Sequence, residues 1–350
     1  MSLYVNIKGL PLVVESYELE VLSLEVRSDF TRLSTVVHLY GAGEQGLGED
    51  VTYDGAEHER QLERGPVLPL SGAWTLGSFS RHLGNQPLFD HEPAQHAYLD
   101  YRRWAFESAA LDLTLRQNGM ALGEAVGRKP KPVTFVVSGG LGEPPTTERV
   151  RGILANQPGL KFKLDARPSW DDAIVAELVE LGCVDSVDFK GHYTGTVVDN
   201  PPDAALYRRI VEAFPDAWLE DPALDDQTLP ILEPHAARVT WDAPIHSVQD
   251  IEALRWPPRT VNVKPSRFGS VERLLAAYDY CAEHDIGAYG GGQFELGVGR
   301  GHIQLLAALF HPDTPNDVAP GGYNEAIPAA GLPSSPLTVT PRTTGFLTES

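Results

Sequence analysis

Charged residues close the apolar stretches in the second half of this chain at a regular spacing. The stretches read LKFKLD, SVDFKG, AWLEDP, VTWDAP and VNVKPS, and the residues that close them are Lys163, Asp188, Glu220, Asp242 and Lys264. They lie roughly 22 to 32 residues apart, about the length of a strand, a loop and a helix. Consecutive βα units form a parallel barrel whose active site lies at the carboxyl ends of the strands. The spacing therefore predicts an α/β fold, a modified TIM-like (β/α) barrel, and it predicts where the chemistry takes place.

The net charge and the cysteine content of the chain argue against several kinds of binding partner. The 350 residues carry a formal net charge of −20, which argues against nucleic acid and anionic membranes as partners. A small anionic substrate would then need a bound cation and local lysines. The two cysteines lie in separate segments without a CxxC pattern, so neither a disulfide framework nor a zinc site is expected. No signal peptide or membrane-length apolar run is present, and we expect a cytoplasmic protein.

A change of hydrophobic period divides the chain. Residues 11–90 alternate as antiparallel strands do, and residues 94–117 carry a helical apolar stripe. After two prolines at 130 and 132, eight apolar strands alternate with helices, ending in a short strand at 317–320. We therefore expect an α+β capping domain over 1–128 and a barrel over 129–320. The tail over 321–350 is expected to pack back on the capping domain.

Three carboxylates at consecutive strand ends predict a metal site. Asp188, Glu220 and Asp242 would repel one another without a cation, and each would raise the pKa values of its neighbours. Oxygen ligands suit Mg²⁺, for which Mn²⁺ substitutes readily. Each acid alone could instead cap the helix that follows it, but three in succession favour the metal.

Lysines flank the three carboxylates on both sides. Lys161 and Lys163 are two positions apart on one strand and are expected to face the barrel mouth together, where each would depress the pKa of the other. Lys264 would approach from the opposite side of the metal. A base on each side of a substrate permits proton removal from one face and return to the other. Lys190 is two positions beyond Asp188 and is expected to point inward, either to pair with Glu220 or its neighbour or to touch the substrate.

The ordered set of strand-end segments resembles the enolase superfamily, and within it the muconate-lactonizing subgroup. The segments are KFK, VDFKG, WLEDP, TWDAP, VKPSRFGS and GGGQFELGVG, preceded by FESAALDLTLRQNGMALGEAVG at the junction of the two domains. The resemblance extends over nearly the whole chain. Two departures stand out: Lys190 where many members carry Asn, and Asp-Ala-Pro at 242–244 where Asp-Glu is common.

The resemblance implies a Mg²⁺-assisted removal of the proton α to a carboxylate, a chemistry in which a Lys base works with Mg²⁺. It implies Asp188, Glu220 and Asp242 as metal ligands. Catalysis would fall to Lys163 and Lys264 as the acid/base pair, with Lys161 tuning Lys163 or binding the carboxylate. Further substrate contacts would be Lys190, Gln293 and Glu295. Loops of the capping domain near 27–32 and 53–55 would close over the substrate.

More than one reaction fits this site. Dehydration of the o-succinylbenzoate synthase type and cycloisomerisation of the muconate type are the leading candidates, followed by epimerisation of a dipeptide or an N-acyl amino acid. A barrel that binds an acidic metabolite without catalysis is the alternative from another class. A histidine-based metal hydrolase is disfavoured, because no HxH follows the first strand. A homo-oligomer is the general expectation.

Overall fold

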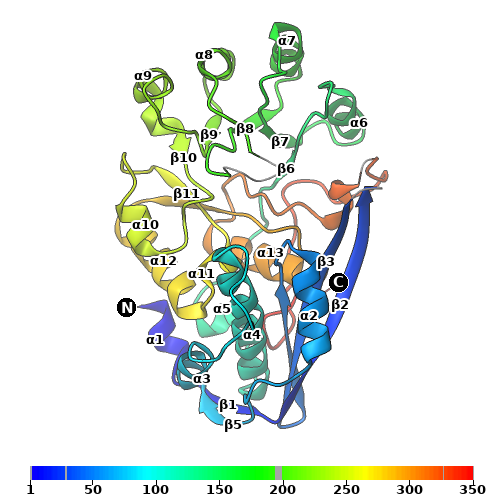
Figure 1. Ribbon diagram of the computed structural model, residues 1–350, viewed down its shortest axis with the longest axis vertical. Helices are drawn as coiled ribbons and strands as arrows, with labels where there is room; N and C mark the ends of the chain where they lie inside the picture. The colour runs from blue at the N-terminus through cyan, green and yellow to red at the C-terminus, as the bar shows by residue number, and fades with distance from the viewer. Residues whose placement is uncertain (1, 28–29, 194–198, 326, 350) are drawn as a thin grey trace.

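An antiparallel sheet packed against a long helix forms the first part of the chain (Figure 1). The computed structural model describes residues 2–27, 30–193, 199–325 and 327–349. The elements of this part are α1 (Leu3–Ile7), β1 (Pro11–Val14), β2 (Ser16–Arg27), β3 (Phe30–Gly41), β4 (Glu44–Asp50), α2 (Gly55–Arg64), β5 (Gly72–Thr75), α3 (Leu76–Leu83), α4 (Ala97–Gln117) and α5 (Leu122–Ala125). Strands β2, β3 and β4 pair in that order, and β1 pairs with β5.

Two glycines let β4 lie directly on α4. A Cβ atom on Gly48 would lie 1.9 Å from the carbonyl oxygen of Ala105, and one on Gly46 would lie 2.2 Å from that of Ala109. No side chain fits in such a gap, so glycine is required for this close approach of strand to helix. The packing fixes the sheet against the helix that leads into the barrel.

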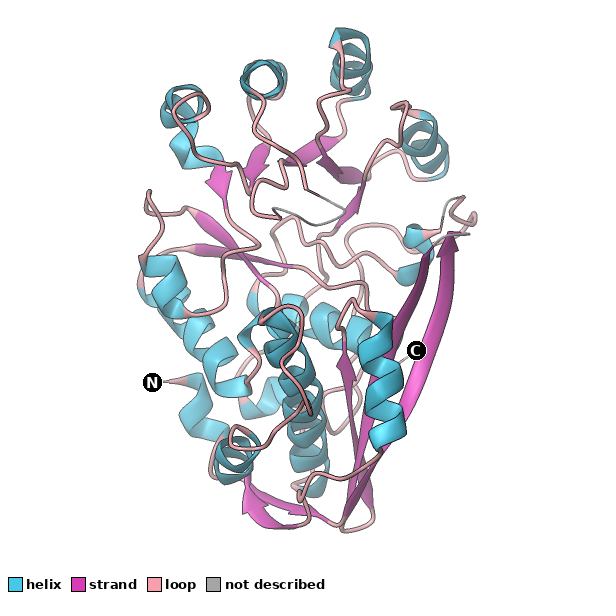
Figure 2. Ribbon diagram, in the orientation of Figure 1, coloured by secondary structure: helices cyan, strands magenta, loops and turns pink. Residues whose placement is uncertain are grey.

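A ring of short parallel strands forms the second part. The elements are β6 (Val136–Gly139), α6 (Glu148–Asn156), β7 (Lys161–Asp165), α7 (Asp172–Leu181), β8 (Val184–Asp188), α8 (Ala204–Ala213), β9 (Trp218–Glu220), α9 (Leu229–Leu232), β10 (Val239–Thr240), α10 (Val248–Glu252), β11 (Thr260–Val263), α11 (Pro265–Phe268), α12 (Val271–Glu283), β12 (Gly287–Gly290) and α13 (Val298–Phe310). Two 3₁₀ helices, η1 (Glu233–Arg238) and η2 (Gly321–Asn324), complete it. Helices α6, α7, α8 and α9 stand outside the strands (Figure 2).

The ring closes through backbone contacts between its sheets. Strands β6 to β10 form one parallel sheet in sequence order, and β11 pairs with β12. Further backbone contacts join Asn262 to Trp241, Gly291 to Asp317, and Phe135 to Asn316. The eighth strand expected at 317–320 is reduced to these bridges at residues 316 and 317. The predicted (β/α) barrel with a capping part is confirmed.

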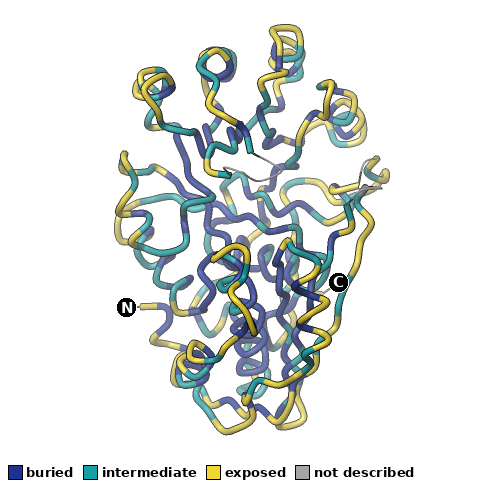
Figure 3. Tube along the Cα trace, viewed as in Figure 1, coloured by how far each residue is buried: buried dark blue, intermediate teal, exposed yellow. Residues whose placement is uncertain are grey.

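The inner elements of the fold are buried and the outer helices are partly exposed. The strands of the ring and the helix α4 are buried, whereas the outer faces of α6 to α9 are exposed (Figure 3). Both cysteines are free and buried. Among the described helices, none is both long and apolar enough to cross a membrane.

The C-terminal segment returns to α4. The amide of Phe346 donates a hydrogen bond to Asp112 (2.6 Å), and its ring meets that of Trp104 edge to face. The amide of Leu122 donates to the carbonyl of Gly345. These contacts place the end of the chain beside the helix that precedes the barrel.

Candidate active site at the mouth of the barrel

Two of the three predicted metal ligands, Asp188 and Glu220, lie side by side where their strands end. Asp188 is the last residue of β8 and stands in register with Glu220, the last residue of β9. Asp242 lies two residues beyond β10, the neighbour of β9. All three side chains are fully buried. The βα spacing thus gathers these acids at one edge of the sheet, because adjacent parallel strands end at the same level.

Asp221 joins this group, although it was not among the metal ligands predicted from the sequence. Among the described residues, Asp188, Glu220 and Asp221 have carboxylate oxygens that all lie within 4.8 Å of one another. Asp221 also accepts hydrogen bonds from the amides of Asp242 and Ala243, each at 2.8 Å. Burial, together with the charges of Asp242 and Asp188, raises the pKa of Asp221 to about 7. Its carboxylate therefore holds the loop that carries Asp242.

Asp242 faces two cations. It accepts hydrogen bonds from Lys264 Nζ (2.9 Å) and from Arg267 (2.6 Å), and the hydroxyl of Tyr193 lies 3.3 Å away. Burial raises the pKa of Asp242, but Arg267 and Lys264 outweigh burial and hold that pKa well below its ordinary range. Asp242 is thus ionised, and its position is fixed by these partners.

Lys163 lies at the centre of the carboxylates. Its Nζ contacts Glu220 and lies 3.5 Å from Asp188 and 3.6 Å from Asp317. Burial lowers the pKa of Lys163, but the charges of Glu220, Asp188 and Asp317 raise it well above the ordinary value. The expectation of a pKa depressed by a second lysine is therefore wrong, because the nearest charges are negative.

Lys161 lies outside this cluster, which corrects the prediction that it faces the mouth beside Lys163. It is exposed, and its Nζ donates to the carbonyl of Gly182 at the end of α7 (2.7 Å). Lys161 is the first residue of β7 and precedes Lys163 by two residues, about 6.6 Å along the strand. It therefore lies near the opposite rim of the barrel. A long side chain there reaches water, which avoids burying a second ammonium group.

Lys190 pairs with acids other than those expected. Its Nζ lies 2.5 Å from Asp188 and 3.3 Å from Asp165, rather than beside Glu220 or Asp221. Burial raises the pKa of Asp188, but Lys190 and Lys163 together lower it to about 2. Lys190 therefore keeps Asp188 ionised while its own side chain lines the cavity at the mouth.

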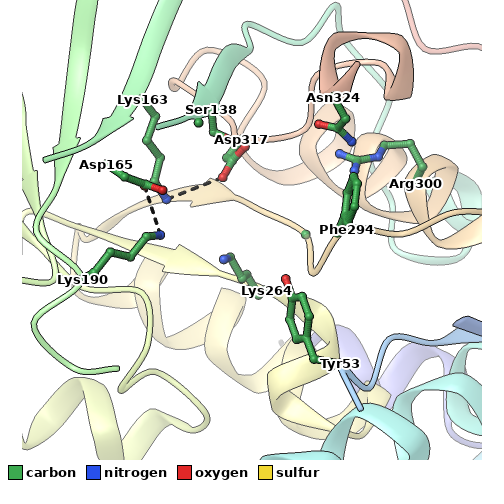
Figure 4. A pocket seen from close by; sticks show the side chains of 12 residues that line it. Tyr53, Ser138, Lys163, Asp165, Lys190, Lys264, Phe294, Arg300, Asp317 and Asn324 are labelled. Atoms are coloured by element: carbon green, nitrogen blue, oxygen red, sulfur yellow. Dashed lines mark ion pairs between the residues drawn. The ribbon is translucent and has the colours of Figure 1, made fainter. Parts of the chain in front are cut away.

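A polar cavity of about 250 Å³ opens above these groups (Figure 4). Lys163, Asp165 and Lys190 lie together on one side of it, and Arg300, Asn324 and Phe294 lie together on the other, with Lys264 and Tyr53 between. Its lining consists of Tyr53, Ser138, Gly139, Lys163, Asp165, Lys190, Lys264, Gly292, Phe294, Arg300, Asp317 and Asn324.

Gln293 and Glu295 are not among the residues that line this cavity, which corrects their expected role as substrate contacts. The amide group of Gln293 donates to the hydroxyl of Tyr101 (3.1 Å), and Glu295 accepts from the backbone amide of Gln293 (2.7 Å). Phe294 lies between them, has a φ of 59°, and lines the cavity instead. This left-handed turn sends the two polar side chains into the protein.

The loops of the first part of the chain reach the cavity through Tyr53. Arg32 is fully buried and donates to the carbonyls of Thr52 (2.5 Å), Val51 (2.8 Å) and Gln293 (3.0 Å). Its guanidinium also lies over the ring of Tyr53. Arg32 thus ties the predicted lid loop at 53–55 to the loop after β12. Residues 28 and 29 of the other lid candidate lie outside the described residues.

Several site residues were not chosen from the sequence. Ser138 and Asp317 come from the first and last strands of the ring, Arg267 and Arg300 from α11 and α13, and Asn324 from η2. Asp317 is the first residue of the short strand expected at 317–320, and an acid at that position was a usable signal. The helical residues carried no such signal, because their approach depends on how α11 and α13 pack.

Comparison with known proteins gives one consistent picture. Residues 129–325 match the family described as "Domain of unknown function (DUF8230) C-terminal domain", and residues 5–125 match its N-terminal domain. An o-succinylbenzoate synthase of Geobacillus stearothermophilus is 26% identical over 230 residues, 63% of this chain and 59% of that protein. This chain thus matches less than two thirds of that relative's length. An N-succinylamino acid racemase of Thermus thermophilus is 24% identical over 325 residues, 87% of this chain and 85% of that protein.

Solved structures show the same fold. A dipeptide epimerase from Enterococcus faecalis V583 has a TM-score of 0.68 at 16% identity, and the match covers 97% of this chain and 100% of that one. A dipeptide epimerase from Methylococcus capsulatus, complexed with a Mg ion, has a TM-score of 0.67 at 18% identity, with coverage of 90% and 92%. At these identities the likeness establishes the fold.

Proposed function

This chain belongs to the DUF8230 family and to the enolase superfamily, and we propose that it is a Mg²⁺-dependent lyase or isomerase that removes the proton α to a carboxylate. The observation that carries this proposal is the pair of buried lysines, Lys163 and Lys264, which line one cavity and contact the buried carboxylates of Glu220 and Asp242.

The donor set fits a hard divalent cation. Buried carboxylate oxygens gathered within a few ångströms are ligands of the kind that Mg²⁺ and Mn²⁺ prefer. We assign the ion to Asp188, Glu220 and Asp242, with Asp221 holding the loop of the third ligand. When bound, Mg²⁺ supplies positive charge that stabilises the negative charge developing on the carboxylate oxygens of the substrate.

The chain itself supplies the proton transfers. Lys163 comes from β7 and Lys264 from the end of β11, so their Nζ atoms approach the cavity from different strands of the ring. One amine takes the α-proton and the other can deliver a proton to the opposite face. Tyr53, from the loop before α2, and Phe294, from the loop after β12, line the cavity and reduce access of water to the reacting carbon.

The choice of reaction depends on how many lysines act. Dehydration of the o-succinylbenzoate synthase type requires one base, which removes the α-proton. Cycloisomerisation, followed in its reverse direction, also requires one base for the α-proton. Epimerisation of an N-acyl amino acid or a dipeptide requires both. Lys163 and Lys264 are both buried and both line the cavity, which favours epimerisation as the second candidate function. Paired lysines at one cavity also argue against a barrel that only binds a metabolite. The cytoplasm and a homo-oligomer remain the proposed location and assembly.

Exchange of α-protons in D₂O tests the proposal. The protein with Mg²⁺ is mixed with a panel of N-acyl amino acids, dipeptides and other carboxylates, and deuterium uptake is followed by NMR. Uptake should vanish on addition of EDTA. Lys163→Ala should abolish uptake by a dehydratase, whereas an epimerase should lose uptake for one enantiomer only. In Lys264→Ala an epimerase should lose exchange for one enantiomer, whereas a dehydratase should keep its first step.

Lys161→Ala is the matched control for these variants. It removes a lysine from the same strand as Lys163, but the structure places Lys161 outside the cavity. It should therefore exchange protons at the wild-type rate. Equal loss in Lys161→Ala and Lys163→Ala would contradict the assignment of Lys163 as the base, and no exchange with any member of the panel would count against the proposed reaction class.

A further inference from the structure

Tyr289 reaches across the interior of the ring to one of the proposed metal ligands. It is the third residue of β12 and is 4% exposed. Its hydroxyl donates a hydrogen bond to the carboxylate of Glu220, the last residue of β9. Strands β10 and β11 lie between β9 and β12 in the ring, so the hydroxyl arrives from a strand that is not a neighbour of β9.

The hydroxyl of Tyr289 has a single proton, which it shares with Glu220. The hydroxyl of Thr240 lies 3.2 Å from that of Tyr289 but makes its shorter bond, of 2.9 Å, to the carbonyl oxygen of Thr260. Burial, together with the charge of Glu220, raises the pKa of Tyr289 well above its ordinary value. The hydroxyl therefore stays a neutral donor to Glu220 across the neutral pH range.

The two oxygens of Glu220 have partners of different kinds. Lys163 Nζ contacts Oε1, and the hydroxyl of Tyr289 donates to Oε2. Lys163 lines the cavity, whereas Tyr289 is not among the described residues that line it. An incoming cation repels the ammonium group of Lys163 but not a neutral hydroxyl. Entry of a cation would thus free Oε1 and leave Oε2 with Tyr289.

Mg²⁺ and Ca²⁺ make different demands on a carboxylate. Mg²⁺ requires a near-octahedral set of ligands at short distances, whereas Ca²⁺ accepts longer distances, more oxygens and both oxygens of one carboxylate. A glutamate that is held by a hydroxyl and offers one oxygen suits Mg²⁺. A glutamate that is free to turn and offer both oxygens suits Ca²⁺.

We propose that Tyr289 is a positioning residue that holds Oε2 of Glu220, leaves Oε1 for the ion and thereby favours Mg²⁺ over Ca²⁺. The inference rests on the proposed function, because it takes Glu220 as a metal ligand. Tyr289 acts through Glu220 and from beneath the cavity, so it touches neither the substrate nor the ion.

The affinities for two ions test this role without any measurement of activity. Calorimetry gives the Kd of the metal-free protein for Mg²⁺ and, separately, for Ca²⁺. Loss of a group that orients a metal ligand costs about 10- to 100-fold in affinity. In Tyr289→Phe we expect the affinity for Mg²⁺ to fall at least about tenfold and that for Ca²⁺ less than about threefold. Tyr289→Met also lacks the hydroxyl and should show the same change of preference.

Two control variants separate the hydroxyl on Glu220 from support of the fold. Tyr278→Phe makes the same change at a tyrosine that is also 4% exposed, but its hydroxyl lies 3.1 Å from His311 rather than beside an acid. Thr240→Val removes the neighbouring hydroxyl and leaves the bond from Tyr289 to Glu220 in place. Both controls should keep the wild-type ratio of the two affinities, and urea unfolding verifies that each variant is folded.

A purely structural role of Tyr289 predicts a different outcome. Tyr289→Phe would then weaken the binding of Mg²⁺ and Ca²⁺ by the same factor, or Thr240→Val would lose the preference to the same extent as Tyr289→Phe. Either result would overturn the inference, and so would unchanged affinities in Tyr289→Phe and Tyr289→Met.

The role of Tyr289 and the proposed reaction fail in different ways. If the preference for Mg²⁺ depends on Tyr289 but the protein exchanges no α-proton, the role of Tyr289 stands and the reaction class does not. If exchange requires Mg²⁺ but Tyr289→Phe keeps the wild-type ratio, the reaction stands and the role of Tyr289 does not. A wild type that binds neither ion would contradict the ligand assignment and this inference together.

Discussion

Glu49 joins the capping part to the barrel through a single buried carboxylate. It lies on β4 and accepts hydrogen bonds from the backbone amides of Leu296 (2.7 Å) and Gly299 (2.8 Å), from that of Gly297 through both oxygens, and from the hydroxyl of Ser34 (2.7 Å). The side chain is 1% exposed. Replacing it with glutamine keeps the shape but turns one acceptor into a donor.

The cost of Glu49→Gln follows from the donors that lose their acceptor. Whichever way the new amide is oriented, its NH₂ group faces backbone N–H groups that point at it. A buried donor left without a partner costs about 1–3 kcal/mol. Loss of a negative charge at the start of α13 adds up to about 1 kcal/mol. With two amides affected, we expect a destabilisation of about 2–7 kcal/mol.

Urea unfolding followed by tryptophan fluorescence measures this loss. The midpoint should fall while the slope with urea stays unchanged, because the same surface is exposed on unfolding. Hydrogen exchange should also quicken at residues 294–300, which include the cavity residues Phe294 and Arg300. Glu44→Gln, at the exposed start of β4, is the control. A loss below about 1 kcal/mol would refute the argument, since it falls under the cost of one orphaned donor.

Three further perturbations test other parts of the structure. Gly48→Ala should destabilise the protein by about 1–3 kcal/mol in urea unfolding, because the new Cβ would lie 1.9 Å from a carbonyl oxygen of α4. Gly9→Ala is the control: the space around Gly9 is open, so this substitution should have little effect. Burial raises the pKa of Asp50, but the charge of Arg102 outweighs burial, so the pKa of Asp50 is lowered in the folded protein. The stability that Asp50→Asn loses at neutral pH should therefore shrink as the pH falls below about 3.8. A difference in stability that does not depend on pH would contradict this. Asp221→Asn should weaken Mg²⁺ binding about tenfold in calorimetry, and an unchanged affinity would exclude its role in holding the ligand loop.

The sequence pattern was enough for the barrel and for the acids at its mouth. Asp188 and Glu220 end their strands as expected, and Asp242 follows two residues after β10. The reason is local: an apolar strand that is buried on both faces must end where a charged side chain can leave the core, and parallel strands end at one level. Lys264 follows from the same rule, whereas Lys163 is the middle residue of β7 and lies two residues before the end of that strand.

Directions of side chains away from the strand ends were decided by the tertiary structure. Lys161 shares a strand with Lys163 but begins it, and its side chain reaches water at the other rim of the barrel. Gln293 and Glu295 sit in the loop expected to touch substrate, but a left-handed turn at Phe294 directs them inward. No local pattern encodes such turns, because they depend on what packs against the loop.

The sequence by itself therefore determined the barrel and the identity of the charged groups that meet at its mouth, because the period of the βα units fixes which residues end the strands. The tertiary structure alone decided the partner of each charge and the reach of α13, which brings Arg300 to the far side of the cavity. Those features depend on contacts between segments far apart in the chain, such as Glu49 with the loop before α13. Spacing along the sequence carries no record of such distances.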